Sequence, residues 1–134
     1  MRMSKFLAGS GLLCLLAAPV SAQMASPMPE SYRQVQLNAL ELQRQVLLAM
    51  ADSMPVQFYR DKVTPIQRDF AQQLEHAAGS LVYIVSSVMK AAPPAPADTA
   101  TYLNTRAGLQ GFINATYDWA GNVLKTQTAA QREA

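Results

Sequence analysis

The chain has 134 residues, a formal net charge of +2, 15% charged residues, one cysteine and one histidine. This length suffices for one compact domain. A single cysteine excludes an intrachain disulfide and a CxxC motif for metal or redox chemistry. The sequence also contains no phosphate-binding loop and no dinucleotide-binding fingerprint.

The first 22 residues have the three-part pattern of a secretory signal peptide. Arg2 and Lys5 precede a short apolar run at 6–18, and small residues at 20–22 suit cleavage after residue 22. The apolar run is shorter than the roughly 20 residues that a membrane span needs. We therefore expect an exported bacterial protein, periplasmic or secreted, with no stable membrane span after cleavage.

Cleavage would also change the bulk properties of the chain. It would remove Cys14 and two basic residues, and so leave nine basic and nine acidic residues. A neutral mature chain has no electrostatic reason to bind nucleic acid or an anionic membrane. Residues 23–30 are then predicted to be a disordered lead-in, and residues 31–134 a single helical domain.

A first helix is predicted from Ser31 to Ser53, where apolar residues recur every three or four positions. Pro55 follows and ends it. The side chains expected to face the core are Val35, Ala39, Leu42, Val46 and Met50, with Leu40 and Leu47 widening the stripe.

A second helix is predicted from Thr64 to about Lys90. Thr64 and Gln67 have capping-box spacing, and Pro65 stands at the first helical position. The expected core face consists of Ile66, Phe70, Leu74, Ala77, Leu81, Ile84 and Val88. The Pro-Ala sequence at 91–98 then predicts a semi-rigid extended connector.

A third helix is predicted from about Asp98, a suitable N-cap residue, to about Thr128. Its apolar residues form two stripes. The first consists of Leu103, Ala107, Ile113, Tyr117, Ala120 and Leu124, and the second of Leu109, Phe112, Trp119 and Val123. A helix that is apolar on two sides needs more than one neighbour.

The segment from Met54 to Gly79 joins a Met-Pro pair, a Thr-Pro pair and the only histidine of the chain. It resembles a segment of the DinB-like family of four-helix-bundle proteins. The matching positions are Met54, Pro55, Tyr59, Lys62, Thr64, Pro65, Arg68, Phe70, Leu74, His76 and Gly79. The resemblance implies an all-α, up-and-down helical bundle. This sequence would supply three long helices of it, with the fourth short or missing.

Two consequences of a missing fourth helix are open. The third predicted helix could split near Gly108–Gly111 and supply a short extra helix. Alternatively, an apolar groove lined by Phe112, Trp119 and Val123 would remain uncovered. Because burying an apolar side chain is worth about 1.5–3 kcal/mol, such a groove would favour a homodimer formed through an apolar helix face.

The resemblance also implies a divalent metal, nickel or zinc, held by three histidines in a cleft of the bundle. Only His76 carries over as a metal ligand, whereas catalytic zinc usually has three protein ligands. Glu75 and Asp118 are carboxylates that could substitute. The sequence identifies no catalytic residue and no complete cofactor site. We expect His76 to be partly buried and hydrogen-bonded to a tyrosine or a backbone carbonyl.

Three classes of function follow. The favoured one is an exported DinB-like bundle without a complete metal site, which acts by binding or assembly rather than catalysis. A second is a metal-dependent enzyme of this family, a thiol transferase or hydrolase-like protein with non-standard ligands. The third is a periplasmic chaperone-like protein, because the string at 63–68 is similar to the LTxxQ motif of such proteins. A Thr-x-x-Gln capping box explains the same string without that function.

Overall fold

The computed structural model describes residues 30–95 and 102–126, and within these ranges the chain is helical and contains no strand. The α-helices are α1 (Glu30–Ser53), α2 (Phe70–Met89) and α4 (Arg106–Thr126), and the 3-10 helix η2 spans Val56–Phe58. The all-α prediction is confirmed for this part of the chain. The predicted signal peptide, residues 23–29 of the predicted lead-in and the Asp98 cap lie outside the described residues, whereas Glu30, the last lead-in residue, begins α1.

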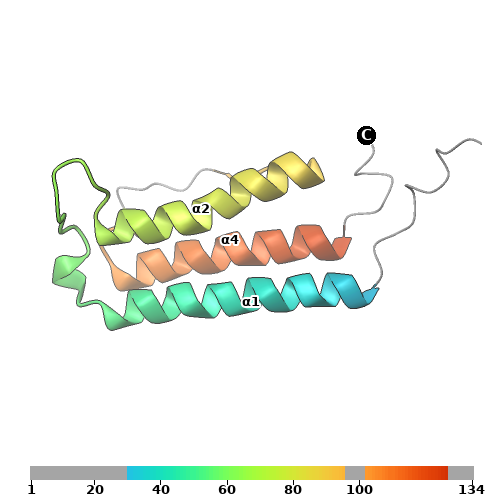
Figure 1. The fold of residues 1–134 in the computed structure, drawn as a ribbon, viewed down its shortest axis with the longest axis horizontal. Helices are drawn as coiled ribbons and strands as arrows, with labels where there is room; N and C mark the ends of the chain where they lie inside the picture. Colours follow the sequence, from blue (N-terminus) through green and yellow to red (C-terminus); the bar gives the residue numbers. More distant parts are fainter. Residues whose placement is uncertain (1–29, 96–101, 127–134) are drawn as a thin grey trace, which may run out of the picture.

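Helix α4 lies between α1 and α2 and packs along both of them (Figure 1). The order of residues along the bundle gives the helix directions. Leu47 and Ala77 lie beside Tyr117, whereas Leu40 and Met89 lie beside Leu124. Helices α2 and α4 therefore run in the same direction, and α1 runs opposite to both (Figure 1).

The expected up-and-down order thus holds for α1 and α2 but is wrong for α2 and α4. The physical reason is the length of the connector between them. Residues 90–105 separate the two helices, and an extended chain advances about 3.1 Å per residue. Such a connector is long enough to return along a helix of 20 residues, which is about 30 Å long.

Two clusters of buried side chains form the core. The larger one contains Ala51, Tyr59, Ala71, Leu74, Ala78, Tyr102, Leu103, Leu109, Ile113 and Tyr117. The smaller one contains Val85, Met89 and Ala120. Burial of Leu103, Ile113, Tyr117 and Ala120 confirms most of the first stripe predicted for the third helix. Of the other two members of that stripe, Ala107 is exposed and Leu124 is partly buried.

The predicted core face of α1 is wrong for its five main members, which are exposed, and correct for Leu40 and Leu47, which pack against the core. Leu42 keeps 63% of its surface exposed, and Val35, Ala39, Val46 and Met50 are also exposed. The α1 side chains that pack against the core are Leu40, Leu47, Leu48 and Ala51. Helix α1 has extensive contact only with α4. A single neighbour buries a narrow face, and periodicity does not reveal which of two apolar faces that is.

The predicted start of α2 at Thr64 is also wrong. Residues 64–67 form a turn, in which the Gln67 amide donates to the Thr64 carbonyl oxygen at 3.2 Å, and Ile66 is 96% exposed. The helix begins at Phe70 instead, after the N-cap residue Asp69. Asp69 and Gln72 form the capping box, with the Gln72 amide 2.8 Å from the Asp69 carboxylate.

The predicted core face of α2 is correct only in part. Leu74 is buried, and Phe70 and Leu81 are partly buried against the core. In contrast, Ala77, Ile84 and Val88 are exposed. The other buried residues of α2 are Ala71, Ala78, Val85 and Met89, so the buried face is rotated from the predicted one. The predicted end of the helix is confirmed, because Lys90 follows Met89 in the left-handed conformation that ends many helices.

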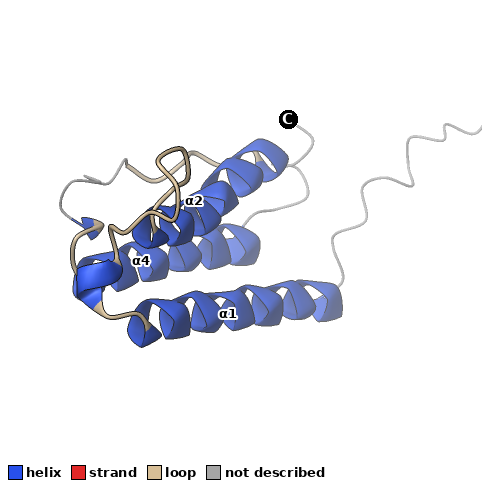
Figure 2. Cartoon of the chain, turned by 60° about the vertical axis from the view of Figure 1, so that its left-hand side comes forward, coloured by secondary structure: helices blue, strands red, loops and turns tan. Residues whose placement is uncertain are grey.

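The loop of residues 54–69 joins α1 to α2 (Figure 2), and Tyr59 holds it to the bundle. This side chain is fully buried, and its hydroxyl donates to the backbone carbonyl oxygen of Ala51 at the end of α1. The Tyr59 carbonyl accepts from the Ala71 amide at 3.0 Å, and its ring lies 5.5 Å from that of Phe70. One residue of the loop thus contacts the end of one helix and the beginning of the next.

Helix α4 begins at Arg106, with the Thr105 hydroxyl oxygen accepting from the Gly108 amide at 3.0 Å, as an N-cap residue does. The helix continues without a break through Gly108 and Gly111 to Thr126. A split near Gly108–Gly111, the first of the two alternatives that the sequence left open, is therefore wrong. Within residues 30–95 and 102–126, no helix combines the length and the apolar composition that crossing a membrane requires.

Candidate binding groove

His76, the residue expected to be a metal ligand, lies on the exposed surface of α2. Its backbone carbonyl accepts from the Ser80 hydroxyl at 2.7 Å, as is common for a serine within a helix. The expected partial burial of His76 is wrong. No hydrogen bond to a tyrosine or carbonyl holds its imidazole within the part of the chain that the structure describes.

The side chains near His76 do not fit the three-ligand site that the resemblance implies. No group of three His, Cys, Asp or Glu residues converges among the residues searched, 30–95 and 102–126. Asp118 of α4 instead forms an ion pair with Arg44 of α1 at 2.8 Å. Glu75 is adjacent to His76 on α2, and so its side chain points in a different direction around the helix. The described donor set is therefore incomplete.

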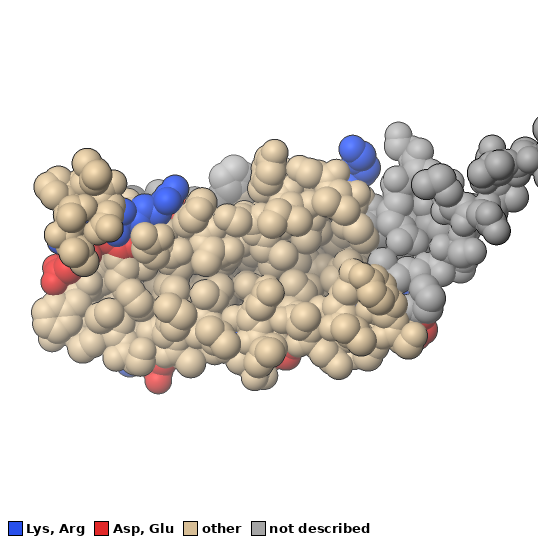
Figure 3. Space-filling model, viewed as in Figure 1, with Lys and Arg blue, Asp and Glu red and all other residues tan. Residues whose placement is uncertain are grey.

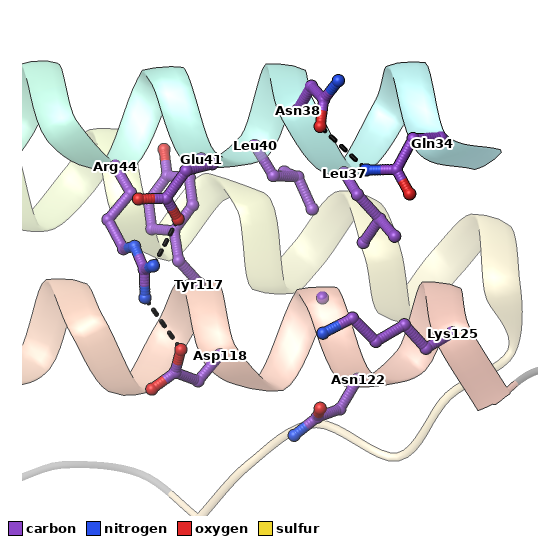
Figure 4. A pocket seen from close by; sticks show the side chains of 11 residues that line it. Gln34, Leu37, Asn38, Leu40, Glu41, Arg44, Tyr117, Asp118, Asn122 and Lys125 are labelled. Atoms are coloured by element: carbon purple, nitrogen blue, oxygen red, sulfur yellow. Dashed lines mark hydrogen bonds and ion pairs between the residues drawn. The ribbon is translucent and has the colours of Figure 1, made fainter. Parts of the chain in front are cut away.

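A hollow with polar walls does exist, between α1 and α4 (Figure 4). Its volume is about 290 Å³, and Arg44 bridges Glu41 and Asp118 across it. Lys125 lies at the other end of the hollow. Two cationic and two anionic side chains line it, so it has no net charge that would select a charged ligand. The Arg44 bridge joins α1 to α4 and has a structural role.

The second kind of hollow is apolar and lies between α1 and α2. Both helices pack along α4 but make only marginal contact with each other. A groove therefore runs between them, which we call the α1–α2 groove. One part, of about 270 Å³, is lined by Gln36, Ala39, Leu40, Gln43, Ile84, Val85, Val88, Met89 and Leu124. Another, of about 390 Å³, is lined by Leu42, Gln43, Val46, Leu47, Ala77 and Tyr117.

No charged side chain lines either part of the α1–α2 groove. Figure 3 shows this face of the molecule, where the charged side chains of the described residues lie toward the ends and edges of the bundle. Its exposed aliphatic residues include Val46, Ile84 and Val88. Exposed apolar surface that is contiguous and has a polar margin is typical of an interaction site.

The groove differs from the one expected from the sequence. Phe112 stacks on Tyr102, with the ring centroids 4.6 Å apart and the rings parallel within 1°. Trp119 and Val123 are partly buried against the smaller core cluster. These three residues thus pack within the bundle, and the apolar side chains left exposed belong to α1 and α2 instead.

Helix α1 has a further exposed feature at the rim of the groove. Tyr32, Val35, Ala39, Leu42, Val46 and Ala49 recur at alternating intervals of three and four residues, and all six are exposed. We call this row the α1 seam. The spacing of the row is visible in the sequence, whereas its exposure depends on how α1 packs against α4.

Comparisons of this chain with protein-family models, with curated proteins and with solved structures find no match.

Proposed function

We propose that this chain is an exported, DinB-like helical-bundle protein without a complete metal site, and that it acts by binding or assembly rather than by catalysis. The observation that carries the proposal is the α1–α2 groove, which has apolar walls, no charged lining residue and no helix above it among the described residues. The ligand that suits such a surface is an α-helix with an uncharged aliphatic face.

The geometry of the bundle supports a helical ligand. Helices α1 and α2 are both neighbours of α4 but hardly of each other, which is the relationship of diagonal helices in a four-helix bundle. The open position is therefore one helix wide. Val46, Ile84 and Val88 are between 51% and 66% exposed, and burying the remainder of each would contribute about 1 kcal/mol.

The proposal is tested with a fluorescently labelled, uncharged helical peptide of about 20 residues, long enough for about 30 Å of groove. We expect fluorescence anisotropy to report binding to the wild-type chain. Ile84→Glu places a charge in the groove and should weaken binding at least about tenfold, because that factor corresponds to only 1.4 kcal/mol. Tyr83→Glu changes the adjacent residue, which does not line the groove, and should bind as the wild type does.

Two results would contradict the proposal. One is a folded wild-type chain that does not bind the peptide at a concentration where the chain is monomeric, or binds it equally well after Ile84→Glu. The other is stoichiometric nickel or zinc in the purified protein that is lost in His76→Ala. That second result would favour the metal-dependent enzyme with ligands beyond those described here.

A further inference from the structure

We propose that the α1 seam pairs with the α1 seam of a second copy of this chain. This inference rests on the proposed function, since it names the helix that covers the uncharged apolar surface of α1 and α2. The first observation is the spacing of the seam. Its alternating intervals of three and four residues give a mean repeat of 3.5, which is the repeat of a coiled-coil interface.

The second observation is that the fold does not use this row. Its six residues are all exposed, and Tyr32, Val35 and Leu42 are each more than half exposed. The buried residue of α1, Ala51, lies on a different side of the helix, as do the core-packed Leu40 and Leu47. This regular apolar row of 18 residues is not needed to hold α1 against α4.

The third observation concerns the side chains that flank the seam. At the positions that correspond to e and g of a heptad lie Gln36 and Gln43 on one side, and Asn38 and Gln45 on the other. Charged residues at these positions normally select a different partner or a particular orientation. Amides donate and accept hydrogen bonds, so each can lie opposite the same residue of a twin without repulsion.

The charged residues of α1 form ion pairs with other charged residues. Arg44 pairs with Glu41 and Asp118, Glu30 pairs with Arg33, and Asp52, which flanks the end of the row, pairs with Arg106. The surface is thus neutral and self-complementary, as a two-fold symmetric interface requires. The segments that the structure does not describe are 1–29, 96–101 and 127–134; most of the first is the predicted signal peptide, and the other two are shorter than the 18-residue seam. A second copy of α1 has the required length and chemistry.

Sedimentation equilibrium of the purified protein between about 1 and 100 µM tests the proposal, since that range brackets the dissociation constants usual for weak homodimers. We expect a dimer. Leu42→Glu should raise its dissociation constant at least about tenfold, because two carboxylates would meet in an apolar seam. Val63→Glu changes an exposed aliphatic residue of the 54–69 loop and should leave the dimer intact. Circular dichroism should show that both variants are folded.

A charge exchange makes the test specific for pairing of the seam with itself. Leu42→Glu and Leu42→Lys chains should each be monomeric, and an equimolar mixture of the two should dimerise. Leu42 lies near the middle of the seam, so it is close to its twin whether the two helices run parallel or antiparallel.

The possible failures are distinguishable. A wild-type chain that is monomeric, but binds the uncharged peptide in an Ile84-dependent manner, would overturn the pairing of the α1 seam with a second copy and leave the proposed function in place. A monomer that binds no peptide would overturn both. A dimer that survives Leu42→Glu would show that another surface pairs.

Discussion

The carboxylate of Asp69 stabilises two parts of the chain at once. One oxygen accepts from the Gln72 amide at 2.8 Å and caps α2, while the other lies 2.9 Å from Nε of Arg60 in the preceding loop. Asp69 is only 1% exposed. The beginning of α2 and the end of the loop are therefore fixed by the same side chain.

We expect Asp69→Ala to lower the free energy of unfolding by about 1–3 kcal/mol, because it removes the N-cap and leaves Arg60 without its partner. Asp69→Asn should cost less, since asparagine also caps helices but carries no charge. Urea denaturation of the two variants separates the contribution of the N-cap to the free energy of unfolding from that of the ion pair. Equal losses would show that capping is not the larger contribution.

Removing the Tyr59 hydroxyl should also destabilise the fold. Tyr59→Phe keeps the ring contact with Phe70 but leaves the Ala51 carbonyl without its buried donor. The expected loss is about 1–2 kcal/mol, measured by chemical denaturation. Tyr59→Ala should cost about 3–5 kcal/mol, because it also opens a cavity. A Phe variant as stable as the wild type would mean that water replaces the lost bond.

The two glycines near the beginning of α4 should respond to alanine in opposite directions. A Cβ atom at Gly108 would lie 2.7 Å from Cα of Tyr102 and 2.8 Å from the Thr105 hydroxyl oxygen, so backbone would have to move. We expect Gly108→Ala to cost about 1–3 kcal/mol. A Cβ at Gly111 meets nothing within 4 Å among the described residues.

Gly111→Ala should therefore raise the free energy of unfolding by up to about 1 kcal/mol, since alanine is the better helix former. Thermal melts of the two variants side by side provide the measurement. A stabilising Gly108→Ala would show that the turn before α4 is farther from the helix than described here.

Two leucines distinguish the core from the exposed seam. Leu109 is fully buried, and Leu109→Ala should cost about 2–5 kcal/mol at every protein concentration. Leu42 is 63% exposed, and in a dilute sample its replacement by alanine should change stability by less than about 0.5 kcal/mol.

If the seam pairs with a second copy, the effect of Leu42→Ala should increase with protein concentration, because dimerisation stabilises only the folded wild type. Denaturation at two concentrations about a hundredfold apart tests this, since that factor is worth about 2.7 kcal/mol in a simple linkage. A large cost of Leu42→Ala at the lower concentration would place this side chain in the core of the single chain.

Burial raises the pKa of the Tyr117 hydroxyl in the folded protein. Above pH 10 or so, the ordinary pKa of tyrosine, the unfolded chain loses this proton while the folded chain keeps it. The contribution is therefore fully present below that pH, and the free energy of unfolding falls as the pH rises beyond it. Tyr117→Phe should show a shallower fall between about pH 9 and 11. Tyr83→Phe, at an exposed position, controls for loss of a hydroxyl.

Much of the local structure followed from the sequence. Pro55 predicted the end of α1 correctly, and the Pro-Ala connector predicted the end of α2. Buried Leu103, Ile113 and Tyr117 were also predicted. These features depend on backbone chemistry and on periodicity within one segment, and both can be evaluated without knowing the neighbours of that segment.

The start of α2 could not be predicted in the same way, because two capping boxes of identical spacing lie five residues apart. Thr64 with Gln67 and Asp69 with Gln72 both satisfy the local rule. The second one caps the helix, since only there can the chain also hold Tyr59 in the core and pair Arg60 with Asp69. Contacts between segments therefore determine where α2 begins.

The sequence by itself determined the helical class, the helix ends that proline marks, and the shortage of histidines for a metal site. Only the tertiary structure decided which apolar face of α1 is buried and which is left exposed. Val35, Leu42 and Val46 have the periodicity of a core stripe, yet α4 packs against Leu40, Leu47 and Ala51 instead. The physical reason is that burial depends on the number and position of neighbouring helices, and α1 has one full neighbour where its sequence offers two apolar faces.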